Sequence, residues 1–166
     1  MIHSNELKGL RVLNTRPLEQ GQHLSRAIHE AGGISIDFPS IAIEPTPIDW
    51  VNILPNLINV QYAIFISANA VRFFYETLKQ CQLKWPAVIK TIAIGQASAA
   101  QLANYNVPVN YIPSVADSEH LLQIGALQDV KHQTFLLVKG VGGRTTIGDT
   151  LLQRGADVVT LDVYRR

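Results

Sequence analysis

Short apolar stretches alternate along the chain with stretches in which apolar residues recur at helical spacing. The stretch 10–15 predicts a strand, and the pattern at 17–31 predicts a helix that Gly32 and Gly33 end. Alternation at positions 34, 36 and 38 predicts a second strand. The succession then recurs, with predicted strands at 62–67, 91–94, 109–112, 134–139 and 158–163 and with helices that begin at residues 70, 97, 117 and 145.

This succession indicates the fold class. Strands that alternate with helices of about ten to fifteen residues favour right-handed crossovers and a mostly parallel sheet with helices on both faces. The sequence therefore predicts an α/β fold. Residues 39–47 depart from the pattern, because they read as an extended segment interrupted by prolines. We interpret this segment as a crossing between two domains.

The composition narrows the function classes. The chain has 166 residues and a hydrophobic fraction of 47%, which fits one domain, or a small domain with part of another, around a sizeable core. The formal net charge is +1, and no window clusters basic with aromatic residues, so the sequence does not favour binding to DNA or RNA. The apolar runs are too short to cross a membrane and residues 1–8 form no signal segment, so we expect a cytoplasmic protein.

Cysteine and histidine give no sign of a metal site. The single cysteine, Cys81, shares a predicted helix face with Val71, Phe74 and Leu78, so we expect a buried structural thiol. The five histidines show no metal-ligand spacing. We therefore predict no metal.

Small or polar residues follow the predicted strands. In a parallel sheet such clusters lie at one edge, where doubly wound folds bind ligands and where helix N-termini favour anions. The alternative is that these residues only cap helices and form turns; with four clusters at one edge, the two interpretations are about equally supported. The clusters are Thr15-Arg16, Ser67-Ala68-Asn69, Gly95-Gln96-Ala97-Ser98 and 140–144 (GVGGR).

The glycine-rich cluster at 140–144 differs from known nucleotide loops. It is neither a G-x-G-x-x-G fingerprint nor a P-loop, which disfavours nicotinamide and ATP. Its glycines still allow a ligand to approach the backbone, and Arg144 can bind a carboxylate with two hydrogen bonds. The chain also lacks a G-x-S-x-G elbow. The cluster therefore points to an anionic ligand, and any catalysis must depend on how that ligand is held.

The clusters, read in order, resemble those of the uroporphyrinogen-III synthase (HemD) family. Together the matching segments cover nearly the whole chain, and the Gly-Gly-Arg segment followed by Arg-Gly-Ala and Val-Tyr-Arg is the specific part. The segments are 12–17 (VLNTRP), 64–71 (IFISANAV), 92–95 (IAIG), 118–122 (SEHLL), 139–144 (KGVGGR), 151–158 (LLQRGADV) and 163–165 (VYR).

The resemblance implies two flavodoxin-like α/β domains joined by two crossing strands, with the active site between them. By this resemblance residues 1–38 are an incomplete fragment of the first domain, and 48–160 are the complete second domain. The interdomain strands would be 39–47 and 161–166. Three residues depart from the family pattern: Asn14 stands at a usually apolar position, Ser98 where threonine is common, and His120 in place of glycine. Asn14 would either loosen the first strand or face the cleft.

The resemblance also implies an activity. Family members cyclise hydroxymethylbilane, a linear tetrapyrrole, to uroporphyrinogen III with inversion of ring D and loss of water, and no cofactor or metal takes part. Tyr164 resembles the family tyrosine that faces the cleft, so it is a candidate proton donor; the alternative is a strand aromatic that packs between domains. The implied substrate-binding residues are Thr15, Arg16, Ser67, Ala68, Asn69, Gly95, Gln96, Ser98, Ser118, Gly142, Gly143 and Arg144.

Two further expectations concern the function of the chain as given. A non-enzymatic anion-binding or sensor module of the flavodoxin-like type is the alternative function, and it would bind small dicarboxylates as well as tetrapyrroles. Because the first domain looks incomplete, we expect the 166-residue chain to be catalytically inactive. Its open strand edges predict a homo-oligomer that forms through residues 1–38.

Overall fold

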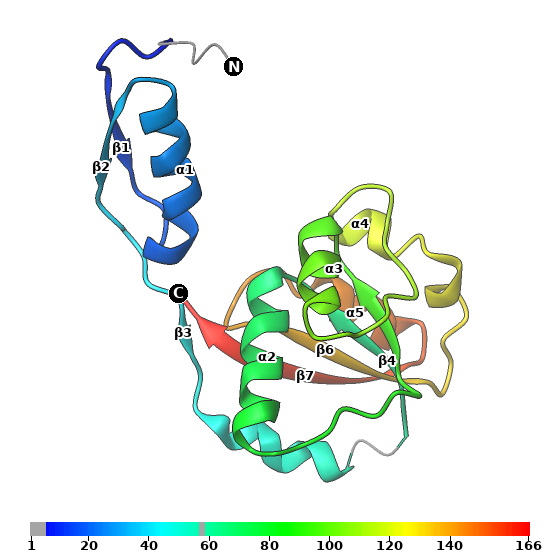
Figure 1. Ribbon diagram of the computed structural model, residues 1–166. Helices are drawn as coiled ribbons and strands as arrows, with labels where there is room; N and C mark the ends of the chain where they lie inside the picture. Colours follow the sequence, from blue (N-terminus) through cyan, green and yellow to red (C-terminus); the bar gives the residue numbers. More distant parts are fainter. Residues whose placement is uncertain (1–5, 57–58) are drawn as a thin grey trace. The chain divides into compact units, whose positions relative to one another are not determined.

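The computed structural model describes residues 6–56 and 59–166, and Figure 1 traces them. They form two compact units. The first contains the chain up to Glu44 together with Arg166, and the second contains Pro45–Arg165. No helix in the described part of the chain is long and apolar enough to cross a membrane.

The first unit is one strand–helix–strand repeat. Strand β1 (Arg11–Asn14) pairs in parallel with β2 (Ile34–Asp37), and helix α1 (Leu18–Glu30) connects them. This confirms the elements predicted for this part of the sequence. The helix buries Gly21, Ser25 and Ile28, whereas Leu13 of β1 is 58% exposed.

A polar cluster lies inside this unit, centred on Asn14. Its side chain is 2% exposed, and its amide nitrogen donates to the carbonyl oxygen of Gly21 (3.0 Å) and to Ser25 Oγ (2.8 Å). Ser25 Oγ and Ser35 Oγ in turn donate to Asp37 Oδ1, at 2.5 Å and 2.8 Å. Asn14 therefore joins β1 to α1, which is neither of the two roles expected for it.

The second unit is built around a parallel sheet. Strand β4 (Val60–Phe65) pairs in parallel with both β5 (Lys90–Ala93) and β6 (Thr134–Gly140), and β6 pairs in parallel with β7 (Asp157–Arg165). The short strand β3 (Glu44–Pro45) completes the order β3-β7-β6-β4-β5. The helices are α2 (Ala68–Gln80), α3 (Gln96–Ala103), α4 (Ser118–Leu121) and α5 (Thr146–Gln153), with 3₁₀ helices η1 (Ile48–Asn56) and η2 (Gly125–Leu127).

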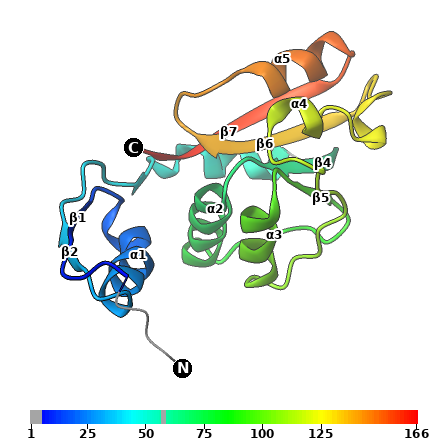
Figure 2. The same ribbon diagram turned by 90° about the horizontal axis from the view of Figure 1, so that it is seen from above.

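Both faces of this sheet are covered, which explains why its strands read as continuous apolar runs. Figure 2 shows α2 and α3 on one side and α5 on the other. Ile64 and Leu137 pack into the cluster that contains Ile147 and Leu151 of α5. Their neighbours Phe65 and Leu136, which point to the opposite face, are fully buried as well. The mixed α/β architecture with a parallel sheet is thus confirmed.

Two local predictions were wrong, and a third was right about where a helix begins but not about its length. Residues 109–112 form no strand but a single bridge, between Tyr111 and Ile92, because Pro108 and Pro113 flank the segment and offer no N–H group for a ladder. The helix predicted from residue 117 has four residues, Ser118–Leu121. Cys81 is exposed, because α2 ends at Gln80 and the cysteine begins the next turn.

Candidate functional site

The order of the strands defines one edge of the second unit's sheet as the candidate site. All four long strands are parallel, so their carboxyl ends lie at the same edge. The chain continues from β4 to β5 on one side of β4, and it returns to β6 on the other side. In open α/β sheets, ligands bind outside the carboxyl ends of the strands at such a reversal. Here the reversal lies between Ser67, after β4, and the 140–144 loop, after β6.

Tyr164 lies at this edge, in β7 opposite Gly140 of β6. Its side chain is 4% exposed, and its ring is stacked on Phe73 of α2, with 5.8 Å between ring centroids and 20° between planes. A Cβ atom on Gly140 would stand 2.5 Å from the Tyr164 ring, so only glycine leaves room for the tyrosine. The ring is therefore held between a helix and a strand.

Ser67 connects Tyr164 to the start of helix α2. Its Oγ accepts a hydrogen bond from the Ala70 N–H (3.0 Å) and lies 3.2 Å from the Tyr164 hydroxyl. Ser67 is thus the N-cap of α2, as residues of its type often are, and it also contacts the candidate proton donor. The capping interpretation is thus confirmed for Ser67, whereas ligand binding by this cluster stays a prediction. Ala68 and Asn69, in the first turn of α2, are half-buried beside it.

The carboxyl end of β5 and the amino-terminal end of α4 lie at the same edge of the sheet. Gly95 precedes α3, and a Cβ atom on it would stand 2.6 Å from the Cβ of Ala116. This close approach brings Ser118, the first residue of α4, towards the end of β5. Gln96 is exposed at the start of α3, whereas Ser98 is 2% exposed within that helix.

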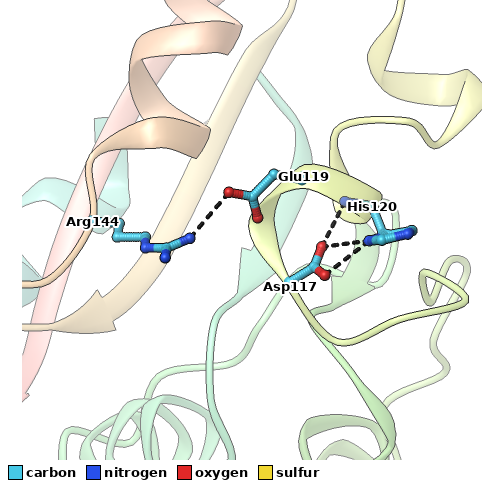
Figure 3. A network of polar contacts seen from close by, with 4 residues as sticks. All are labelled: Asp117, Glu119, His120 and Arg144. Carbon is cyan, nitrogen blue, oxygen red and sulfur yellow. Dashed lines mark hydrogen bonds and ion pairs between the residues drawn. The ribbon is translucent and has the colours of Figure 1, made fainter.

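The 140–144 loop contacts α4 through an ion pair, drawn in Figure 3. Gly142 and Gly143 have φ angles of 76° and 84°, the left-handed region that glycine adopts readily. Arg144 Nη1 donates to Glu119 Oε1 at 3.0 Å, and the two side chains are 72% and 56% exposed. The arginine predicted to bind a substrate carboxylate is thus in contact with a carboxylate of the chain itself.

A second pair in Figure 3 fixes the start of α4. Asp117 Oδ1 accepts from the His120 N–H at 2.7 Å, and His120 Nδ1 lies 2.8 Å from both carboxylate oxygens. The backbone hydrogen bond from His120, followed by the one from its side chain, lowers the pKa of Asp117. His120, which replaces a usual glycine, therefore helps to hold the short helix that carries Ser118.

The predicted site residues fall into three groups. Thr15 and Arg16 follow β1 in the first unit, where both are exposed and the Arg16 N–H donates to Asn14 Oδ1 at 3.2 Å. Ser98 belongs to the second unit but is buried. The rest come from the segments at the carboxyl ends of the strands: Ser67, Ala68, Asn69, Gly95, Gln96, Ser118, Gly142, Gly143, Arg144 and Tyr164.

Sequence reasoning missed the partners of these residues. Phe73, which stacks on Tyr164, has the spacing of an ordinary core aromatic of α2. Glu119 is part of the 118–122 segment, but nothing in the sequence pairs it with Arg144, 25 residues away. Gly140 gave no clear signal, because it is the last residue of β6 and belongs in the sequence to the glycine-rich cluster 140–144.

Comparisons with known proteins agree on one family. The family described as uroporphyrinogen-III synthase HemD matches residues 22–166. The uroporphyrinogen-III synthase of Proteus mirabilis is 32% identical over 160 residues, which cover 93% of this chain and 79% of the relative. That of Escherichia coli (strain K12) is 32% identical over 163 residues, covering 93% of this chain and 64% of the relative.

Solved structures agree in fold. A mutant uroporphyrinogen III synthase from Thermus thermophilus superposes with a TM-score of 0.73 at 20% identity, over 95% of this chain and 62% of that one. A wild-type structure from the same bacterium gives a TM-score of 0.63. The chain thus spans less than two thirds of the Escherichia coli relative and of these structures.

Proposed function

Because the chain belongs to the uroporphyrinogen-III synthase HemD family, we propose that it acts in the cyclisation of hydroxymethylbilane to uroporphyrinogen III. The reaction expels the terminal hydroxyl group as water and closes the macrocycle with ring D inverted. The observation that carries this proposal is the contact between the Tyr164 hydroxyl and Ser67 Oγ at the carboxyl edge of the sheet.

This contact suits proton donation to a leaving hydroxyl group. Tyr164 is buried, whereas Ser67 is half-buried and nearer to solvent. Ser67 Oγ can accept a proton from the tyrosine while its own proton passes to the departing oxygen. The carbon–oxygen bond then breaks and water leaves, while the lone pair of the pyrrole nitrogen stabilises the carbon cation that remains. The tyrosinate left at Tyr164 balances this positive charge, and it recovers a proton when the ring system loses one after closure. We therefore assign Tyr164 as the acid and Ser67 as the relay.

The rest of the edge suits the substrate's carboxylates. Hydroxymethylbilane carries acetate and propionate groups, and the N-terminus of α2 offers backbone N–H donors to anions. Arg144 is 72% exposed and contacts Glu119 through Nη1, so a substrate carboxylate would bind its other N–H groups or displace Glu119. Ser118 and the glycines of the 140–144 loop would line the substrate. Such a site holds one conformer of the bilane among several, which is how it would select the inverted product.

We expect the 166-residue chain alone to be inactive, so the test is the isomer formed from hydroxymethylbilane by the chain extended to the length of its relatives. We expect the type III isomer without any added cofactor, and the same rate after treatment with EDTA. Chromatography of the oxidised products separates the isomers. Formation of the type I isomer alone would contradict the proposal, and binding of small dicarboxylates as tight as that of the tetrapyrrole would favour the anion-binding alternative.

The acid role of Tyr164 has its own test. We expect Tyr164→Phe to slow turnover by roughly 10²-fold to 10⁴-fold and to leave type III as the product, because positioning by the other groups remains. Tyr111→Phe, outside this edge, is the matched control and should retain the parent rate. A Tyr164→Phe protein as fast as its parent would show that the tyrosine only packs between Phe73 and Gly140.

Two further properties stay predictions. We propose a cytoplasmic location, which cell fractionation tests. We also propose that the chain self-associates through residues 1–38, so light scattering of the 166-residue protein should give the mass of a dimer or a larger assembly. A monomer with ordered β1 and β2 would contradict the second proposal.

A further inference from the structure

Strand β7 has one irregular position, just before Tyr164. Lys139 of β6 stands opposite Asp162 of β7. The next residue of β6, Gly140, stands opposite Tyr164, so Val163 is an extra residue in β7. Such an extra residue is a β-bulge, which is rare between parallel strands and often redirects a side chain beside a functional site.

The bulge turns Tyr164 to the face of the sheet that α2 covers. In a regular strand, residues two apart point to the same face. Lys139 is two residues after Leu137, which packs against α5, so Lys139 and the opposite Asp162 lie on the α5 face. Tyr164 is two residues after Asp162, yet its ring stacks on Phe73 of α2, on the other face. A regular strand would place this ring on the α5 face instead.

Contacts on both sides of β7 hold the bulge. On the β6 side, Lys139 Nζ donates to Asp162 Oδ1 at 3.0 Å, and the lysine side chain is only 15% exposed. A partly buried ion pair is screened by salt much less than an exposed one. On the other side, the Thr46 hydroxyl donates to the Asp162 carbonyl oxygen at 2.6 Å, and the Thr46 N–H donates to that of Val163 at 3.3 Å. Asp162 is therefore fixed through its side chain and its backbone, directly before the bulge.

We propose that Lys139 and Asp162 are positioning residues for Tyr164. Their ion pair holds β7 in the bulged register, and this register places the tyrosine hydroxyl 3.2 Å from Ser67 Oγ. If the pair is broken, β7 can slip to regular pairing, in which Val163 takes the place of the ring on the α2 face. The effect on turnover rests on the acid role proposed for Tyr164, whereas the effect on the register of β7 does not.

The position of the ring is tested in the 166-residue chain without substrate. The probe is the nuclear Overhauser contact between the rings of Tyr164 and Phe73, and the Trp50–Phe74 contact, with 5.3 Å between centroids, is the internal reference. We expect Lys139→Met, which removes the charge, to weaken the first contact relative to the second. Lys139→Arg keeps the pair and should match the parent. An unchanged contact in Lys139→Met, or an equal loss in Lys139→Arg, would overturn the proposal.

Turnover is measured on the chain extended to the length of its relatives. We expect Lys139→Met and Asp162→Asn each to lower kcat roughly tenfold to hundredfold, as when a catalytic group is misplaced, and to leave KM unchanged. The double variant should lose no more than either single variant, because both changes break the same pair. Lys79→Met, the same change at an exposed position of α2, should keep the parent's kcat.

The outcomes separate this inference from the proposed function. Parent-like kcat in Lys139→Met, or losses that add in the double variant, would overturn the positioning role. A raised KM at an unchanged kcat would assign Lys139 to substrate binding and would overturn that role as well. An extended parent that forms no type III isomer would contradict the proposed function, and the ring contact would still decide whether the pair holds Tyr164.

Discussion

The two units start from the same repeat but fill their interiors differently. In the first unit, Asn14 of β1 and Ser25 of α1 are buried and joined by hydrogen bonds, while Leu13 of the same strand is 58% exposed. In the second unit, consecutive residues of β6 are apolar and buried on both faces. A strand covered on both faces thus needs no polar side chain. A strand and helix with little apolar surface between them are held by hydrogen bonds instead.

This difference predicts unequal responses to mutation. A buried leucine replaced by alanine typically costs about 2–5 kcal/mol, whereas a typical hydrogen bond contributes about 1 kcal/mol net. We therefore expect large effects from apolar truncation in the second unit, and smaller, more directional effects in the polar cluster of the first.

Leu151 and Leu152 of α5 form a matched pair for the apolar core. Leu151 is fully buried and Leu152 is 54% exposed. We expect Leu151→Ala to lower the free energy of unfolding by about 2–5 kcal/mol and Leu152→Ala to change it by no more than about 0.5 kcal/mol. Urea unfolding followed by tryptophan fluorescence measures both, because Trp50 and Trp85 belong to the second unit. Equal losses would show that this side of the sheet is not the core.

Gly140→Ala tests how closely β6 approaches Tyr164. The added Cβ would overlap the ring, so we expect the free energy of unfolding to fall by about 1–3 kcal/mol, as in an overpacked core. Gly125→Ala is the control, since no atom lies within 4 Å of a Cβ placed there. If Gly140→Ala unfolds at the parent's urea concentration, the ring has room to move and the packing described for it is wrong.

Asn14→Leu replaces a buried polar side chain of the first unit with an apolar one, as in the strands of the second unit. Despite the added apolar surface we expect a loss of roughly 1–2 kcal/mol, because Ser25 and the Arg16 N–H lose hydrogen-bond partners. Amide hydrogen exchange of β1 and β2 measures this loss. Leu13→Asn places the same amide at the exposed neighbouring position and should change the exchange little. Slower exchange in Asn14→Leu would mean that the polar cluster does not stabilise this unit.

The smallest effect concerns pH and Asp37. Hydrogen bonds from Ser25, then Ser35, lower the pKa of this carboxyl in the folded unit. Its contribution is therefore present above the unfolded pKa, about 3.9, and is lost as the pH falls through the lower folded value. We expect faster amide exchange in β2 in acid, after correction for the intrinsic rate, and less of this change in Asp37→Asn. The same pH dependence in both proteins would assign the effect to another group.

The sequence indicated the repeats well because they depend on local patterns. The apolar runs of β4 and β6 and the serine that caps α2 are visible without tertiary contacts. The residues at 109–112 alternate as in a strand, but the prolines on either side limit pairing to one bridge. Cys81 fits the apolar face of a helix that ends one residue before it, and helix ends are the least certain part of any pattern.

The candidate site was predictable in its position but not in its contacts. Parallel strands place Ser67 and the 140–144 loop at one edge whatever the details of packing. The contacts of Tyr164 with Phe73 and of Arg144 with Glu119 arise only when distant segments meet, so no local pattern shows them. Asn14 illustrates the same limit, because an isolated polar residue in a strand does not reveal the Gly21 and Ser25 that satisfy it.

Strand β7 is the last element of the second unit, but it lies between residues near the start of that unit and β6. This order has a consequence for synthesis on the ribosome. The Thr46 N–H donates to the carbonyl oxygen of Val163, and its hydroxyl donates to that of Asp162, 116 residues later in the chain. When translation has reached β6, the side of that strand that will pair with β7 is still open. The nascent second unit therefore exposes a long unpaired strand edge until its last residues leave the exit tunnel, and chaperones would protect it most effectively during that interval.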